Sequence, residues 1–579
     1  MKKLITTIMA LWCLTSTTMA DSNTVTLHFV ETSDVHGAFF PYDFIERRPM
    51  RGTMVRVSTY VNKLRKEHGE GSVILLENGD ILQGQPSCYY TNYVKTDEKN
   101  LAAEIVNYMK FDAAAFGNHD VETGHAVYDK WISEVQCPTL GANIINTSSG
   151  LPYVKPYTIL HRHDVRIAVL GLLTPAIPNW LHENLWSGLR FEEMVASARK
   201  WIKVLKEQEH ADIIIGLFHS GWEGGIATPH YLEDCSRQIA EEVEEFDIIF
   251  YGHDHTENQV HMDNGVLCLD PSCNAQKVAH ATITLKLPDL AAKNNRCEII
   301  SKSGEVVDVT NEEIDEDMMK RFQPQIDSIR AFTERQIGTF LTAMRSRDAF
   351  FGSAAFVDYI HQLQLEHTGA DVSFNAPLQF NTEVKAGPVY MSDMFKLYRY
   401  ENSIYVLRMT GKEIRKHLEM SYDQWVNTMT SPSDHIMLLA DRSWNDKQRM
   451  GFKNLTFNFD SAAGIDYEVD VTKPNGQKVR ILRFSDGRPF DEDAWYRVAM
   501  NSYRGNGGGE LLVRGAGIPL DSIPSRIEYM SERDQRYYLT QKIEHEGKVR
   551  PRALNNWHFV PAKWTKKAIE RDRKLIFGR

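Results

Sequence analysis

The amino-acid sequence predicts a two-domain protein in which an α/β domain precedes an α+β domain. The chain has 579 residues, too many for a single hydrophobic core. From residue 24 to about 285, short β-branched segments alternate with amphipathic helical segments, which is typical of an α/β domain. From about residue 345 to 560, helical and strand patterns mix without this alternation.

Five short apolar segments of the first domain predict buried strands. They cover residues 24–30, 72–77, 166–172, 212–218 and 247–252. Val57, Tyr60, Val61 and Leu64 recur at helical spacing between the first two segments, and residues 191–210 form a longer amphipathic pattern. Strands and helices are therefore expected to follow one another along this half of the chain.

A charged helical connector is predicted over residues 310–341, because Thr310 and Glu313 form a capping box ahead of spaced apolar residues. The second domain is expected to contain two helices, over 354–367 and 410–425. Its strand patterns cover 402–409, 455–460, 465–471, 478–485 and 495–501. The basic tail, 562–579, predicts a solvated terminal helix.

The first twenty residues have the pattern of a secretory signal peptide. Lys2 and Lys3 precede an apolar segment that ends in small residues at Ala20. We expect a mature chain that crosses no membrane and is periplasmic or secreted. An uncleaved anchor is the alternative, but the apolar segment is short and interrupted by threonines. In an oxidising compartment, Cys268 and Cys273 would be the foremost local candidates for a disulfide.

The charge of the chain limits its partners. The formal net charge is −11 and the isoelectric point is near 6.0. Polymeric nucleic acid is excluded as a partner, because binding it requires basic patches that neutralise phosphates. A small anionic substrate remains compatible with this charge if metal ions supply the positive charge.

Side chains that can bind metals follow five apolar segments of the first domain. They are Asp34, His36, Asp80, Asn118, His119, Asp120, His219, His253 and His255. Each motif alone is typical of a turn or a helix cap, but five of them at strand ends indicate one site. Carboxylate, imidazole and amide donors suit Zn, Mn, Fe, Co or Mg. Their number predicts two divalent ions sharing a carboxylate, as in enzymes that displace a phosphoryl group in line.

In this order, the motifs D-x-H, G-D, G-N-H-D, H and G-H-x-H resemble those of the calcineurin-like metallophosphoesterases. The second domain resembles the C-terminal domain of the 5′-nucleotidase family, over residues 375–380, 397–419, 458–471 and 501–510. The chain looks most similar to the 2′,3′-cyclic-nucleotide 2′-phosphodiesterase/3′-nucleotidase branch. This resemblance implies a β-sandwich flanked by helices for the first domain. The expected division is a signal peptide 1–20, a metallophosphoesterase domain 21–300, a connector 301–344, a substrate-binding domain 345–560 and a basic tail 561–579.

The resemblance implies roles for the individual side chains of the first domain. One ion would be held by Asp34, His36, Asp80 and His255, and the second by Asp80, Asn118, His219 and His253. His119 matches the catalytic histidine, which stabilises phosphoryl charge or protonates the leaving oxygen. Glu122 stands where 5′-nucleotidases have an aspartate that orients this ring, and Asp120 is a weaker candidate for that role.

The resemblance also places a nucleobase between Tyr400 and Tyr503, in contact with Asn402. The arginines with which 5′-nucleotidases hold the substrate are not evident, because Gln379 and Ser353 stand in their regions. These departures favour 2′,3′-cyclic nucleotides and 3′-nucleotides as substrates. Two alternatives stay open: a 5′-nucleotidase or UDP-sugar hydrolase, and a degenerate member that only binds nucleotide. The complete set of metal-binding residues disfavours the second alternative.

Overall fold

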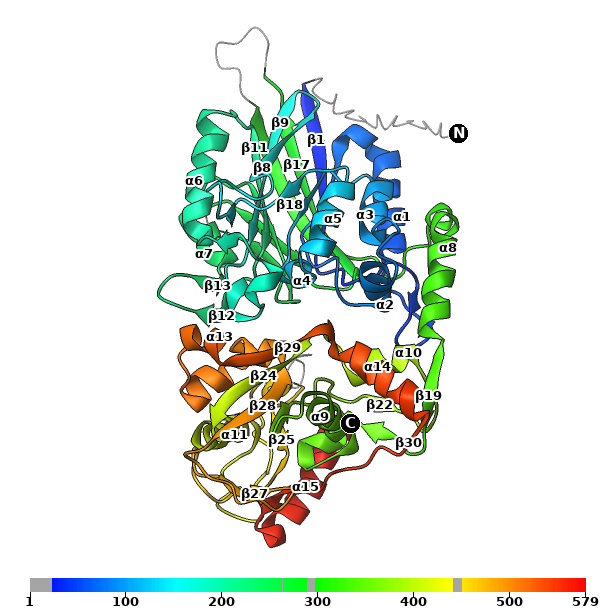
Figure 1. Cartoon of the computed structure of the whole chain (residues 1–579). Helices are drawn as coiled ribbons and strands as arrows, with labels where there is room; N and C mark the ends of the chain where they lie inside the picture. Colours follow the sequence, from blue (N-terminus) through cyan, green and yellow to red (C-terminus); the bar gives the residue numbers. More distant parts are fainter. Residues whose placement is uncertain (1–22, 263, 289–296, 441–449, 579) are drawn as a thin grey trace, which may run out of the picture.

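The computed structural model describes residues 23–262, 264–288, 297–440 and 450–578 (Figure 1). The predicted signal peptide, residues 1–20, lies outside the described residues. Within the described ranges, no helix combines the length and the apolar character needed to cross a bilayer.

Two six-stranded sheets pack face to face in the first domain. The first sheet runs in the order β18 (Glu298–Asp308), β17 (Lys277–Lys286), β1 (Thr24–Thr32), β4 (Val73–Glu77), β5 (Ala113–Ala115) and β6 (Thr139–Leu140). The second runs β15 (Glu257–His261), β16 (Leu267–Pro271), β14 (Ile248–Tyr251), β11 (Ile213–His219), β9 (Val165–Leu173) and β8 (Tyr157–Arg162). Apolar side chains of both sheets, such as Phe29 and Phe250, fill the space between them.

Helices cover the outer face of each sheet (Figure 1). The first sheet is covered by α1 (Met54–His68), α3 (Leu101–Met109) and α5 (His125–Glu134), and the second by α6 (Met194–Glu207) and α7 (Ser236–Glu242). The predicted β-sandwich flanked by helices is therefore confirmed. The five predicted strands are β1, β4, β9, β11 and β14 of this sandwich.

The parallel strands of both sheets end on the side of the domain that faces the second domain. β1, β4 and β5 are parallel neighbours in one sheet, and β9, β11 and β14 in the other. The short helix α4 (Asn118–Glu122) and the hairpin of β12 (Gly224–Ala227) and β13 (Leu232–Asp234) lie at this end (Figure 1). Strand ends from both sheets therefore meet at this end of the domain.

The connector differs from the prediction at its start. Strand β18 extends to Asp308, and the side chain of Asp308 accepts hydrogen bonds from the backbone N–H and hydroxyl of Thr310. The predicted capping box at Thr310 is therefore wrong. Helix α8 (Glu316–Thr333) begins after Asp315, whose carboxylate accepts from the backbone N–H of Met318. In Figure 1, α8 lies along the side of the first domain and leads into β19 (Gln336–Phe340).

The second domain has the α+β architecture that the sequence predicts. Its main sheet runs β25 (Ser461–Ala463), β21 (Val372–Asn375), β28 (Trp495–Asn501), β24 (Ser403–Thr410) and β29 (Ile527–Asp534). A smaller sheet contains β27 (Val479–Phe484), β26 (Ile465–Asp470) and β31 (Trp557–Val560). The helices α9 (Ala355–Thr368) and α11 (Gly411–Trp425) match the two predicted helices.

Three details of the sequence-based description are wrong. Residues 455–460 contain a 3₁₀ turn instead of a strand, because Arg504 binds Asp460 and the carbonyl of Phe457. The terminal helix α15 (Ala562–Phe577) is docked and not solvated, since the buried carboxylate of Asp572 accepts from two backbone N–H groups. Cys268 and Cys273 are free thiols, and Cys268 is buried within β16.

Side chains near the site join the two domains. The hydroxyl of Tyr89 donates to Asp534 Oδ1 at 3.3 Å, and the guanidinium of Arg536 lies 4.6 Å from the centre of the Tyr89 ring. At another point, Asn506 donates to the carbonyl of Trp180 at 3.4 Å. These contacts hold the strand ends of the first domain against the second domain.

Candidate active site

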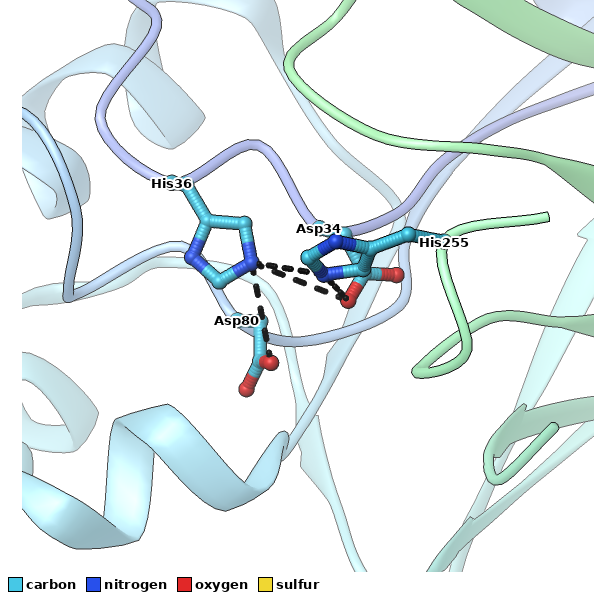
Figure 2. Close-up of side chains that lie close together, drawn as sticks. All are labelled: Asp34, His36, Asp80 and His255. Carbon is cyan, nitrogen blue, oxygen red and sulfur yellow. Dashed lines mark hydrogen bonds and ion pairs between the residues drawn. The ribbon is translucent and has the colours of Figure 1, made fainter. Parts of the chain in front are cut away.

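Four predicted ligands from both sheets meet at the end of the sandwich. The ligand atoms of Asp34, His36, Asp80 and His255 all lie within 4.8 Å of one another. His255 Nε2 is 3.2 Å from Asp34 Oδ1 and 3.0 Å from His36 Nε2. Figure 2 shows these side chains pointing toward one another from separate turns. Asp34 and Asp80 follow strands of the first sheet, whereas His255 follows β14 of the second.

The remaining predicted ligands form a second group that shares Asp80. His219 Nε2 is 3.3 Å from Asp80 Oδ2 and 3.1 Å from Asn118 Oδ1. His253 Nδ1 is 2.7 Å from the same amide oxygen. His36 Nε2 approaches Asp80 Oδ2 from the other side at 3.9 Å. The structure thus brings all the predicted ligands together, with one oxygen of Asp80 facing both groups.

Two buried carboxylate oxygens at this site fit a cation. Asp34 Oδ1 and Asp80 Oδ2 are buried, and neither accepts a hydrogen bond from the residues that the structure describes. The other oxygens are occupied: Asp34 Oδ2 accepts from the hydroxyl of Ser33 and the N–H of His253, and Asp80 Oδ1 from the N–H of His119. A buried charge requires a partner of opposite sign. Divalent ions that favour oxygen and imidazole ligands satisfy this requirement.

Neighbouring histidines keep both carboxylates ionised. Burial opposes the ionisation of Asp34, but His219 and His255 hold its pKa below the usual range. Burial also opposes the ionisation of Asp80, and His219 and His119 hold its pKa well below the usual range. Both carboxylates therefore carry negative charge where almost no water reaches, because Asp34 is 0% and Asp80 is 1% exposed.

The backbone turns that carry the ligands are strained. Asp34, His36, Asp80, His253 and His255 have φ angles of 51°, 48°, 58°, 81° and 58°. This left-handed region costs an L-residue roughly 1–2 kcal/mol. Strain of this kind is found where a site needs side chains aimed in a fixed direction. Here it turns the side chains at the strand ends toward one point.

Asp120 holds the turn that presents Asp80, a role that the sequence did not reveal. Its carboxylate accepts four backbone N–H groups, from Asp80, Ile81, Leu82 and Gly117, at 2.8–3.0 Å. Burial and the charge of Asp80 raise the pKa of Asp120 to about 6. Gly117 must be glycine, since a Cβ atom there would lie 2.1 Å from Asp80 Oδ1.

His119 lies beside the metal-binding groups at the start of α4. Its Nδ1 is 2.5 Å from Glu122 Oε2, one helical turn away, so Glu122 occupies the predicted orienting position. Burial disfavours the charged ring, but Asp80 and Glu122 outweigh it and raise the pKa of His119 to about 9. The His119 ring lies edge-on to His36, with 5.4 Å between ring centres. Because Nδ1 is occupied, Nε2 is the nitrogen that can exchange a proton with a substrate.

The predicted base-binding residues belong to the second domain. Tyr503 lies in α12 (Ser502–Gly505), and Gly508 packs so tightly on its ring that an added Cβ would lie 2.6 Å away. Burial raises the pKa of Tyr503 to about 12, and the nearby Tyr400 and Glu233 contribute to this shift. Tyr400 and Tyr503 are both half-buried. Asn402 is buried, and its amide oxygen accepts from the hydroxyl of Tyr398 at 3.2 Å.

Comparison with known families agrees with this geometry. Residues 27–257 match the family described as calcineurin-like phosphoesterase, and residues 332–514 match the 5′-nucleotidase C-terminal domain. Fold and site together define a metal-dependent phosphoester hydrolase. The chain belongs to the 5′-nucleotidase family of calcineurin-like phosphoesterases.

Individual relatives extend over most of the chain. A Haemophilus influenzae protein named 2′,3′-cyclic-nucleotide 2′-phosphodiesterase/3′-nucleotidase is 25% identical, across 93% of this chain and 88% of the relative. Protein UshA of Escherichia coli is 23% identical, across 85% of this chain and 100% of the relative. The solved structure of a putative 5′-nucleotidase from Staphylococcus aureus has the same fold, with a TM-score of 0.76 and 21% identity, covering 92% of this chain and 100% of that one.

We predict that Asp120→Ala weakens metal binding about tenfold or more, because it frees the turn that presents Asp80. It should also lower the melting temperature of the metal-free protein, since buried N–H groups without acceptors cost about 1–3 kcal/mol each. Calorimetric titration with Mn²⁺ and thermal unfolding in EDTA measure the two effects. Asp97→Ala, at an exposed position, is the control. Unchanged Mn²⁺ affinity in Asp120→Ala would contradict the positioning role.

Proposed function

We propose that the protein hydrolyses nucleoside phosphates, preferentially 2′,3′-cyclic nucleotides and 3′-nucleotides, with two divalent ions of Zn, Mn, Co, Fe or Mg. The observation that carries the proposal is the buried Asp80 Oδ2, which lies 3.9 Å from His36 Nε2 in one donor group and 3.3 Å from His219 Nε2 in the other. One ion would be held by Asp34, His36, Asp80 and His255, and the other by Asp80, Asn118, His219 and His253. Such ions supply Lewis acidity, which neutralises phosphate charge and activates the attacking water.

His119 is the proposed catalytic histidine. Its ring is 26% exposed, beside the donor groups, and Glu122 fixes its Nδ1. With Nδ1 held, Nε2 can donate a hydrogen bond to the phosphoryl oxygens and a proton to the leaving ribose oxygen. Glu122 supports the charged form of the ring, which is the form that has a proton to give.

Tyr400 and Tyr503 are the proposed stacking partners of the nucleobase. Stacking suits a base because every base has a π face, and each contact contributes about 1–3 kcal/mol. Support for the substrate preference comes from two polar side chains of the second domain. Arg504, next to Tyr503, is buried and paired with Asp460, so it cannot hold a terminal group of the substrate. Ser353 is likewise bound to Asp358.

We further propose that residues 1–20 direct export to the periplasm or the medium and are then removed. The positive residues and the small-residue cleavage site of the sequence support this proposal. For the mature chain, we also propose that the substrate-binding domain begins near residue 345.

The substrate proposal is tested with the mature chain, residues 21–579, in Mn²⁺ or Zn²⁺. We expect hydrolysis of 2′,3′-cyclic AMP and 3′-AMP with kcat/KM well above the values for 5′-AMP and UDP-glucose. Phosphate release and chromatography of the nucleoside products measure each rate. Preference for 5′-AMP or UDP-glucose would contradict the proposed substrates. A metal-loaded protein that hydrolyses none of the four would contradict the enzymatic role.

His119→Ala should keep both metal ions but lose turnover by ~10²–10⁴-fold, since its ring acts on the substrate and contributes no metal ligand. Metal content by mass spectrometry and kcat on 2′,3′-cyclic AMP give the two readouts. His125→Ala, at a half-buried position on α5, is the matched control. Loss of metal in step with loss of turnover would instead make His119 a structural part of the metal site.

Tyr503→Ala should raise KM for 2′,3′-cyclic AMP roughly 5–100-fold, the equivalent of one lost stacking contact. Hydrolysis of bis(p-nitrophenyl) phosphate, which has no nucleobase, should stay nearly unchanged. Tyr503→Phe keeps the ring and should behave like the parent protein. Equal losses on both substrates would refute a role in base binding.

A further inference from the structure

Glu233 lies in the β12–β13 hairpin, outside the metal-binding motifs of the sequence, and contacts the predicted metal ligand His253. Its Oε1 lies 3.1 Å from His253 Nε2. The other nitrogen of the same ring, Nδ1, faces Asn118 Oδ1 at 2.7 Å. The ring of His253 is therefore held between the donor group on one side and a carboxylate on the other.

The contact determines which nitrogen of His253 offers a lone pair. A carboxylate only accepts, so Nε2 donates to Glu233. Nδ1 is then the nitrogen that can offer a lone pair to an ion, once it gives up its hydrogen bond to Asn118 Oδ1. His36 and His219 are oriented in the opposite sense, because their Nδ1 atoms donate to the carbonyls of Gln83 and Asn78. Of these three rings, only that of His253 is oriented by a side chain that a substitution can change.

The backbone and the second carboxylate oxygen of Glu233 are fixed as well. Oε2 accepts from the N–H of Ile226 across the β12–β13 hairpin. The backbone carbonyl of Glu233 accepts from the hydroxyl groups of Ser220, which follows His219, and Thr174, which follows β9. The side chain is only 15% exposed. A carboxylate anchored in this way restrains the ring with little loss of its own conformational entropy on binding.

The adjacent carboxylate of Asp234 has another function in the hairpin. Its Oδ1 is 3.9 Å from His253 Nε2, beyond hydrogen-bond distance, and accepts from the N–H of Gly221 at 2.8 Å. Glu233, and not Asp234, therefore orients the His253 ring.

We propose that Glu233 is a positioning residue that holds His253 for the second of the two divalent ions. This inference rests on the proposed function, because it requires His253 to be a metal ligand. Carboxylates that receive the outer N–H of a ligating histidine fix its tautomer and raise its basicity, and their loss typically reduces metal affinity 10–100-fold.

The test measures metal binding without substrate, because Glu233 also lies near Tyr503 and could alter KM through that residue. The metal-free full chain is titrated with Mn²⁺ by calorimetry and with Co²⁺ by visible absorption. The same titrations are made on the variants Glu233→Ala, Glu233→Gln, His253→Ala and the double variant Glu233→Ala/His253→Ala. The matched control is Glu223→Gln on the same segment, where Glu223 is 62% exposed and paired with Arg237.

Glu233→Ala should weaken the second equivalent of metal 10–100-fold and alter its Co²⁺ absorption, while the first equivalent binds as before. Glu233→Gln, which keeps an acceptor oxygen and the shape of the side chain, should recover part of that loss and provides the test if the alanine variant unfolds. In the His253→Ala background, Glu233→Ala should add less than about a twofold effect, because coupled residues are not additive.

The possible failures are distinguishable. If His253→Ala binds two equivalents as tightly as the parent, the ligand assignment of the proposed function is wrong. If His253→Ala loses one equivalent but both Glu233 variants bind like the parent, only the positioning role is wrong. An equal loss in Glu223→Gln would attribute the effect to general surface charge and would also overturn the inference.

Discussion

The site depends on one constraint: two carboxylates, those of Asp34 and Asp80, are buried and ionised a few ångströms apart. Each gives one oxygen to hydrogen bonds from nearby backbone or hydroxyl groups and directs the other toward the histidines. Like charges at this separation are unfavourable in a medium that excludes water, so the arrangement is stable only with positive charge between them. Imidazoles from both sheets surround this position, which makes the end of the sandwich a site for divalent cations.

The fold fixes this arrangement before any ion binds, at a cost in backbone strain. Left-handed turns after β1, β4 and β14 store backbone strain, and the four hydrogen bonds to Asp120 fix one of these turns in place. The packed sandwich supplies the rigid ends from which the turns project. A donor set held in this way loses little entropy on metal binding, which is the advantage of preorganisation over a flexible loop.

Local sequence carried most of the information about the donor set, because each ligand directly follows an apolar strand and its residue type is chemically distinctive. It could not show that the strand ends belong to two sheets, since periodicity says nothing about which strands pair. For a similar reason, local sequence could not predict the roles of Glu233 and Asp120. These roles arise from hairpin and turn contacts that only tertiary structure creates. The same cause made residues 455–460 a turn, because Arg504, distant in sequence, takes their polar groups.

The two domains carry different parts of the proposed active site. All the metal-binding donors and His119 belong to the first domain, whereas the tyrosines proposed to stack the base belong to the second. Under the proposed function, a substrate would therefore reach from one domain to the other, across the boundary at which Tyr89 meets Asp534 and Asn506 meets Trp180. Under the proposed function, the donor set can stay constant while base recognition varies, because the two belong to different domains. The separation between the stacking tyrosines and the donor set would then select the phosphoester that reaches the ions.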